Sequence, residues 1–193
     1  MFLFFVSCHT GHVKNDSNIK GAFQKYKSKF KPLQLPLVLK LADLYKEKLP
    51  TYNAKSTDTM FAHDNALIYG MLPDTAAFYG LITLEHYGPI LTTYDKTGRT
   101  IFTLALKVRD CPADVCYTYW AETTTIDKDL AILCADTIKT TVPEGKNPTG
   151  CTDQHYCLYK DGKVNADGTI VLTEEKTAVL ADSKKSIKNK KKK

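Results

Sequence analysis

Cysteine is the residue type whose number and spacing could do chemistry in this chain. Five of the six cysteines fall within one stretch of 47 residues: Cys111, Cys116, Cys134, Cys151 and Cys157. In an exported protein such a cluster indicates disulfide bonds, whereas in a cytosolic protein it would indicate a metal or redox site. Their spacings are wider than those of the pairs that bind structural zinc. We therefore expect disulfides and no metal site.

The shortest possible bridges join Cys111 to Cys116 and Cys151 to Cys157, while other pairings stay open. Each short bridge would close a small surface loop and contribute about 2 kcal/mol through chain entropy. An odd number of cysteines leaves at least one thiol free. Cys134 is the candidate, because it ends the apolar run Leu130–Cys134 and is expected to be buried and inert.

Motifs for catalysis are missing from the sequence. It contains no G-x-S-x-G, H-E-x-x-H, phosphate-binding loop or dinucleotide fingerprint. His63 stands next to Asp64 and Glu85 next to His86, as acid–base partners would. Neighbours on a strand point to opposite faces, so neither pair converges by itself. We name no catalytic residue and favour a protein that is not an enzyme.

Metal and cofactor sites are not indicated either. Asp127, Asp129 and Asp136 lack the spacing and the terminal glutamate of an EF-hand loop. We interpret all three as turn and strand-end carboxylates, and we expect no cofactor.

The aromatic residues are the best candidates for a binding surface. The chain has 11 tyrosines and one tryptophan, and the candidate face consists of Tyr94, Tyr117, Tyr119 and Trp120. Aromatic side chains on a solvated sheet can bind sugars, peptides or partner surfaces. The alternative is cross-strand packing and core filling.

The N-terminus carries an apolar run, Met1–Ser7, that is far shorter than the about 20 residues of a membrane-spanning helix. Phe5-Val6-Ser7-Cys8 resembles the lipobox of bacterial lipoproteins, in which an apolar and a small residue precede the lipidated cysteine. This resemblance implies cleavage after Ser7 and lipid anchoring to a membrane through Cys8. No Lys or Arg precedes the run, so we interpret it as the end of a longer leader. The alternative is a buried N-terminal strand.

Charge divides the chain unequally. Lys and Arg number 27 and Asp and Glu 21, but seven lysines fall within the last ten residues. The remaining 183 residues carry 20 basic and 21 acidic side chains and are nearly neutral. We therefore expect no specific nucleic-acid binding by the folded part.

Four zones follow from composition. Residues 1–8 are the end of a signal, and residues 9–30 form a polar, lysine-rich tether whose aromatic residues dock on the domain. Residues 31–176 form the β domain. Residues 177–193 form a basic, disordered tail, because they contain too little apolar surface to offset the entropy of ordering.

The domain begins with Leu33–Leu41, where leucine at every second position predicts a strand. Pro36 confines that strand to a sheet edge or to its own first residues. Ala42–Lys48, which stops before Pro50, predicts a short helix or turn.

Short apolar runs then follow one another, separated by turn residues. The expected strands cover residues 61–72, 76–86, 89–94, 100–107, 115–123, 129–138, 154–159 and 169–173. Gly98 predicts a tight hairpin after Tyr94, and Lys160–Gly162 and Ala166–Gly168 predict two further turns. Such spacing without crossover helices predicts an all-β antiparallel meander with at most one short helix, forming a sandwich, a barrel or a propeller-like sheet.

The order of these motifs, from Leu35-Pro-Leu37 through Pro89–Gly98 to Asp167–Thr173, resembles small uncharacterised cell-envelope lipoproteins of Bacteroidetes-type bacteria. This resemblance implies an envelope location and a β-rich fold, and it carries over no catalytic residue.

These observations favour a noncatalytic, lipid-anchored protein of the bacterial cell envelope, facing the periplasm or in the outer membrane. We expect it to bind a protein, peptide or glycan through a sheet face or its loops. The alternative is an envelope hydrolase or inhibitor-like module whose site is assembled only in space.

Overall fold

The computed structural model describes residues 13–51, 61, 66–73, 75–85, 88–109, 117–140 and 153–180. In this part of the chain two helices accompany a set of antiparallel strands, so the all-β prediction is confirmed. The helices are α1 (Val13–Lys27) and α2 (Leu41–Leu44). The strands are β1 (Leu37–Lys40), β2 (Leu67–Met71), β3 (Phe78–Glu85), β4 (Gly88–Asp95), β5 (Thr100–Ala105), β6 (Tyr117–Ile126), β7 (Ala131–Thr140), β8 (Gln154–Val164), β9 (Ile170–Leu172) and β10 (Lys176–Val179).

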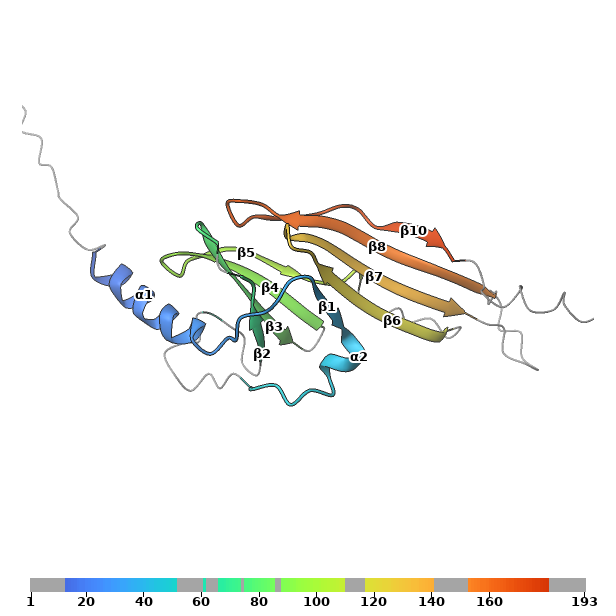
Figure 1. The fold of residues 1–193 in the computed structure, drawn as a ribbon, viewed down its shortest axis with the longest axis horizontal. Helices are drawn as coiled ribbons and strands as arrows, with labels where there is room; N and C mark the ends of the chain where they lie inside the picture. The colour runs from blue at the N-terminus through green and yellow to red at the C-terminus, as the bar shows by residue number, and fades with distance from the viewer. Residues whose placement is uncertain are drawn as a thin grey trace, which may run out of the picture.

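The strands form two open sheets (Figure 1). Sheet A has the order β2-β3-β4-β5, and sheet B has the order β1-β6-β7-β8-β10, with β9 also paired to β8. β1 lies at the edge of sheet B directly after Pro36, as the proline predicts. Of the architectures left open by the sequence, the sandwich is the one observed.

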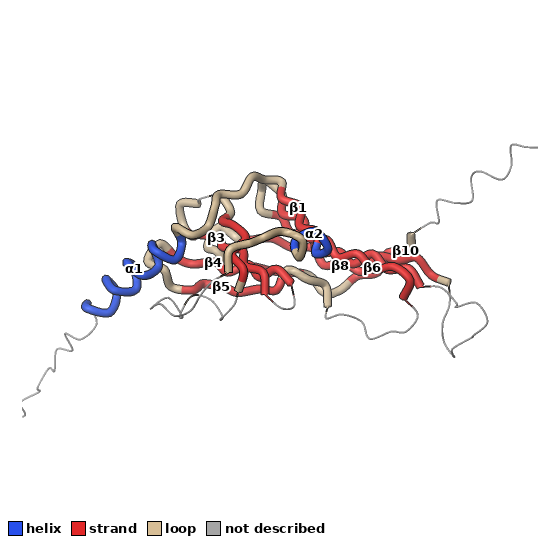
Figure 2. Tube along the Cα trace, turned by 90° about the horizontal axis from the view of Figure 1, so that it is seen from below, coloured by secondary structure: helices blue, strands red, loops and turns tan. Residues whose placement is uncertain are grey.

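The two sheets bury a shared apolar core. Along β7 the buried and less buried residues alternate, and Ile132, Cys134 and Ile138 face inward. Phe78 and Ile82 of sheet A belong to the same cluster. The sheets overlap only in part, however, because β6, β7 and β8 extend beyond sheet A (Figures 1 and 2). One end of sheet B is therefore left without sheet A against its inner face.

Two of the three predicted turns are confirmed. Gly98 has a φ of 96° in the β4–β5 hairpin, where Asp95 Oδ1 accepts hydrogen bonds from the Thr97 and Arg99 N–H groups. Gly168, with a φ of 88°, makes the turn between β8 and β9. Only glycine adopts these left-handed conformations without steric cost.

The turn predicted at Lys160–Gly162 is wrong, because β8 continues through it to Val164. Gly162 pairs with Ile132 on one side and Leu172 on the other. A Cβ atom at this position would lie 1.9 Å from the Val171 carbonyl oxygen. The glycine is needed here for a close approach of two backbones, which is the other common role of glycine in a strand.

Helix α1 occupies most of the predicted tether. Phe23, Tyr26 and Phe30 are buried against the outer face of sheet A, in one cluster with Tyr94. The ring centroids of Phe23 and Tyr94 lie 4.9 Å apart. The docking of the tether aromatics is thus confirmed, but the sequence interpretation did not foresee the helix of 15 residues that carries Phe23 and Tyr26 and ends shortly before Phe30.

The short helix predicted at Ala42–Lys48 is present as α2, one residue earlier and only four residues long. Neither α1 nor α2, the helices of the described residues, is long and apolar enough to cross a membrane.

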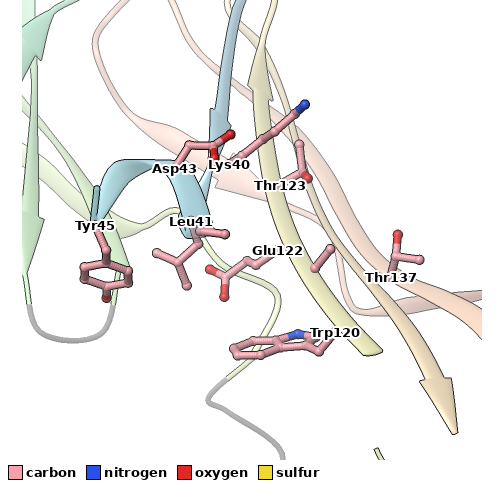
Figure 3. Close-up of a pocket in the computed structure, with 10 residues that line it drawn as sticks. Lys40, Leu41, Asp43, Tyr45, Trp120, Glu122, Thr123 and Thr137 are labelled. Atoms are coloured by element: carbon pink, nitrogen blue, oxygen red, sulfur yellow. The ribbon is translucent and has the colours of Figure 1, made fainter. Parts of the chain in front are cut away.

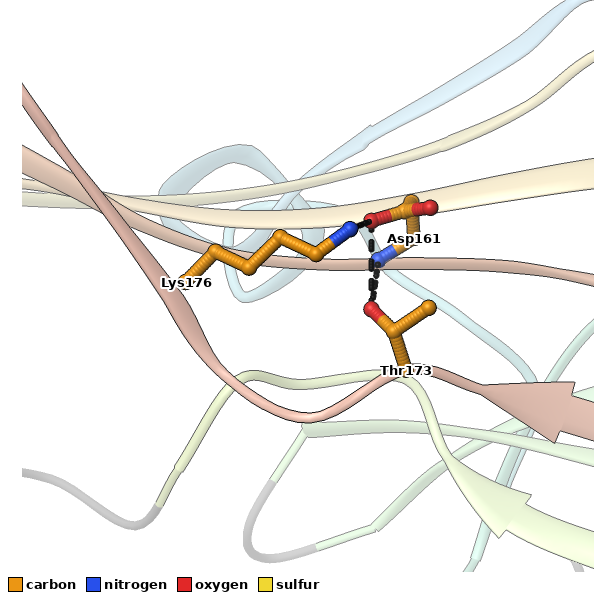
Figure 4. A network of polar contacts seen from close by, with 3 residues as sticks. All are labelled: Asp161, Thr173 and Lys176. Carbon is orange, nitrogen blue, oxygen red and sulfur yellow. Dashed lines mark hydrogen bonds and ion pairs between the residues drawn. The ribbon is translucent and has the colours of Figure 1, made fainter.

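The sheet also continues past the predicted domain boundary. β10, expected in the basic tail, pairs with β8 and places residues 177–179 in sheet B. Lys176 Nζ lies 2.5 Å from Asp161 Oδ1, and the Thr173 hydroxyl donates to the same oxygen at 3.1 Å (Figure 4). These contacts hold the chain between β9 and β10 against β8. Residues 181–193 lie outside the described part.

Candidate functional site

A pair of acidic residues lies on the inner face of sheet B, towards the end that sheet A leaves uncovered. Glu122 of β6 stands directly opposite Asp136 of β7, and Leu158 of β8 continues the row. Asp136 is fully buried, with 0% of its surface exposed. Residues directly opposite in an antiparallel pair have Cβ atoms about 5 Å apart. The register therefore forces the two carboxyl groups close together.

The chain segment after β5 brings basic residues to this pair. The Thr124 hydroxyl donates a hydrogen bond to the Leu106 carbonyl at 2.8 Å, which holds the segment against the inner face of sheet B. Lys107 and Arg109 follow on that segment. The charge of Lys107 lowers the pKa of Glu122, and the charge of Arg109 lowers the pKa of Asp136.

Burial and nearby negative charges favour the neutral forms of both acids. Burial raises the pKa of Glu122 to about 7; the charge of Asp136 adds to this rise, and Lys107 opposes it. Burial also raises the pKa of Asp136 to about 6, opposed by Arg109 and by the indole N–H of Trp120. Between these two pKa values, at about pH 6.5, the pair therefore holds about one proton between its two members.

Several polar atoms of this group lack a hydrogen-bond partner within the described structure. They are both carboxyl oxygens of Asp136, Glu122 Oε1, Trp120 Nε1 and Arg109 Nε, all buried. The Trp120 indole thus lowers the pKa of Asp136, although its N–H group does not reach standard hydrogen-bond geometry. Buried groups without partners are rare in native proteins, and they cluster here around one point. Such a concentration is typical of a place where a ligand completes the contacts.

A pocket of about 560 Å³ opens beside Glu122, between α2 and β6 (Figure 3). The carboxyl group of Glu122 lies between Leu41 and the ring of Trp120, while Lys40 and Asp43 lie towards the opposite side. The remaining lining residues are Ala42, Tyr45, Ala121, Thr123 and Thr137. A few polar groups set among aromatic and aliphatic walls are the usual composition of a ligand site.

The pocket follows a strand edge that is only partly paired. β1 pairs with β6 over Thr123–Ile126. Across the described residues, no strand pairs with Tyr117–Glu122 on that side. The chain leaves the sheet at Leu41, where α2 begins, and α2 then forms the outer wall of the pocket.

A second pocket, of about 610 Å³, lies at the other margin of the same sheet end. Arg109, His155 and Tyr156 line it together with residues of β10. Asp136 lines neither pocket, and its strand β7 lies between β6 and β8 in the strand order. Both pockets therefore lie at the end of sheet B that extends past sheet A.

The predicted aromatic face is only partly assembled. Trp120 lies in the first pocket, and Tyr117 and Tyr119 belong to the same strand, with side chains outside the described part. Tyr94 does not join them, and this part of the prediction is wrong. It lies in sheet A, is 2% exposed beneath α1, and donates its hydroxyl to the Phe61 carbonyl at 2.8 Å.

The cysteine predictions have mixed outcomes. Cys134 is buried and free as expected, and burial raises the pKa of its thiol to about 11. Cys157 also carries a free thiol, so the predicted bridge from Cys151 to Cys157 is not formed. The other predicted sulfur sites, Cys8, Cys111, Cys116 and Cys151, lie outside the described residues.

Of the histidine and acid pairs considered from the sequence, only Glu85 lies in the described part of the chain. His63, Asp64 and His86 lie outside the described residues, while Glu85 ends β3. Within the described chain no three His, Cys, Asp or Glu side chains are grouped as a metal site would require.

Two important residues were missed at the level of sequence. Asp136 is not a strand-end carboxylate, because it lies in the middle of β7 with its side chain buried. The sequence did indicate this burial, because Asp136 lies two residues from both Cys134 and Ile138 and so shares their face of the strand. Glu122 gave no comparable signal, because only the register of β6 and β7 places it opposite Asp136.

No protein-family model matches the chain, and no curated protein or solved structure gives a match. The function is therefore argued from the geometry of this site.

Proposed function

We propose that the protein is a noncatalytic, lipid-anchored component of the bacterial cell envelope that binds a partner through the uncovered end of sheet B. The observation that carries this proposal is the row of buried, unpartnered polar atoms beside the Trp120 pocket. A bound partner would supply the missing hydrogen bonds, which are costly to leave unmade. The lipobox-like Phe5–Cys8 supports the envelope location and the anchor.

A binding role fits the acid pair better than hydrolysis does. Carboxyl pairs that cleave glycosidic bonds flank the substrate from two sides. Here Asp136 is fully buried, and of the two acids only Glu122 lines the pocket beside Trp120. One observation favours the hydrolase alternative, namely the pKa of Glu122 of about 7, which suits a general acid.

Photocrosslinking in the native host tests the binding role. Tyr45 lines the pocket and is 56% exposed, so benzoylphenylalanine replaces it with little change of shape. Phe102 on β5 in sheet A, 37% exposed, is the matched control. We expect a discrete adduct from position 45 that disappears with Trp120→Ala and is absent from position 102. Equal labelling from both positions, or no adduct at position 45, would contradict the proposal.

A further inference from the structure

We propose that the partner is an extended peptide that adds to the free edge of β6 as a new strand and places a Lys or Arg side chain beside Glu122. This inference rests on the proposed function and names the chemistry of its ligand. It joins two features of the site, the unpaired backbone of β6 and the unpartnered carboxyl group in the adjacent pocket.

The backbone edge provides the docking surface. β6 runs from Tyr117 to Ile126, and β1 covers only its last four residues. In the described structure the edge from Tyr117 to Glu122 pairs with no strand on that side. An unpaired edge presents a row of N–H and C=O groups, and peptides bind such edges by adding a strand.

The start of α2 leaves space for that strand. β1 ends at Lys40, and the helix that follows diverts the chain away from the line of the edge. The space between α2 and β6 is the pocket of about 560 Å³. A peptide strand can therefore continue the line of β1 along β6, with one of its side chains entering the pocket.

Strand geometry decides which side chain enters. Trp120 and Glu122 point to the inner face of sheet B, because their register partners Ile138 and Asp136 are buried there. Lys40 lies opposite Thr123 and Leu41 follows it, so the nearest free position facing the same side is the one opposite Trp120. A long side chain at that position lies against the ring of Trp120 and reaches its diagonal neighbour, the carboxyl group of Glu122.

The charges around Glu122 favour a cation. Its buried Oε1 atom has no hydrogen-bond partner in the described part of the chain. The repulsion from Asp136 exceeds the attraction of Lys107, so the surroundings of Glu122 disfavour a second negative charge. The charge of Arg109 lowers the pKa of Asp136. Lys40 and Asp43 line the opposite side of the pocket. An ammonium or guanidinium group would pair with Glu122 and lie against an aromatic ring, which also attracts cations.

Fluorescence anisotropy with short synthetic peptides tests the proposal. The probe is a labelled Thr/Val peptide with Lys at its centre, and the controls carry Gln or Glu there. A further control is the Lys peptide with alternate backbone nitrogens methylated, which removes strand pairing without changing the protein. We expect the Lys peptide to bind at least about tenfold more tightly than the Gln peptide, as for a charge-assisted hydrogen bond. The Glu peptide should bind most weakly.

The protein variant Glu122→Gln should abolish the preference for Lys over Gln, and its circular dichroism confirms that it is folded. Equal affinities for the three peptides, or unchanged binding after N-methylation, would overturn the inference. If the crosslink at position 45 persists under these outcomes, the proposed function stands and the partner is a glycan or another surface. If the crosslink is absent as well, both proposals fail.

Discussion

Glu122→Gln should make the protein more stable at alkaline pH, because it removes an acid that ionises unfavourably in the folded state. The pKa of Glu122 rises from 4.5 to about 7 on folding, and that of Asp136 from 3.8 to about 6. The folded protein therefore holds protons that the unfolded chain has already released. Stability is fully present below the unfolded pKa values and is lost as the pH rises through the folded ones. The expected loss lies between about pH 4 and about pH 7.

The size of the effect follows from the same pKa values. One pKa unit corresponds to about 1.4 kcal/mol, so the rise to about 7 in Glu122 sets an upper limit of about 3 kcal/mol, which solvent screening of this half-buried side chain reduces to about 2 kcal/mol. Asp136 contributes a similar loss, but part of the rise in Glu122 is repulsion from Asp136, and the two losses are not additive. We expect the advantage of Glu122→Gln over the wild type to grow by about 2 kcal/mol from about pH 4.5 to about pH 8.

Urea denaturation followed by circular dichroism, repeated across this pH range, measures the difference. Glu174→Gln is the control, because it removes an exposed carboxyl group. The wild type and the control should lose stability in parallel as the pH rises, while Glu122→Gln should lose less. If all three proteins follow the same curve, Glu122 does not ionise in the surroundings described here, and the argument for an unpartnered carboxyl group fails.

Three further predictions concern the fold and the anchor. Phe23→Ala should lower the free energy of unfolding by about 3 kcal/mol, because Phe23 is fully buried between α1 and sheet A; the exposed Gln24→Ala is its control, and equal melting temperatures would show that the helix is not docked. Gly162→Ala should cost at least about 2 kcal/mol in urea denaturation, because its Cβ atom meets the Val171 carbonyl oxygen, and a neutral result would restore the turn that the sequence predicted. Mass spectrometry of the protein from its own host should find an acylated Cys8 at the N-terminus, and an unmodified peptide beginning at Met1 would refute lipidation.

Much of the fold was predictable because its signals are local. The β4–β5 hairpin depends on Gly98, and the edge position of β1 agrees with Pro36. A tight turn or a proline acts on its own backbone, whatever the rest of the chain does. Helix α1 had a local signal too, since Phe23, Tyr26 and Phe30 are spaced as on one helix face. The lysines between these aromatic residues instead favoured the interpretation as a polar tether.

The site had no such signal, because it depends on which strands share a sheet and in what register. Tyr94 and Trp120 both come from apolar, aromatic strands, yet one lies beneath α1 and the other at the end of sheet B. Glu122 and Asp136 meet only because β6 and β7 pair residue for residue, and a slip by one position between these strands would place the two acids on opposite faces of the sheet. By itself the sequence determined an antiparallel β domain with a buried Cys134 and most of its turns, because these depend on near neighbours. The tertiary structure alone decided that two acids share a buried row beside a free strand edge, because that arrangement requires contacts between distant parts of the chain.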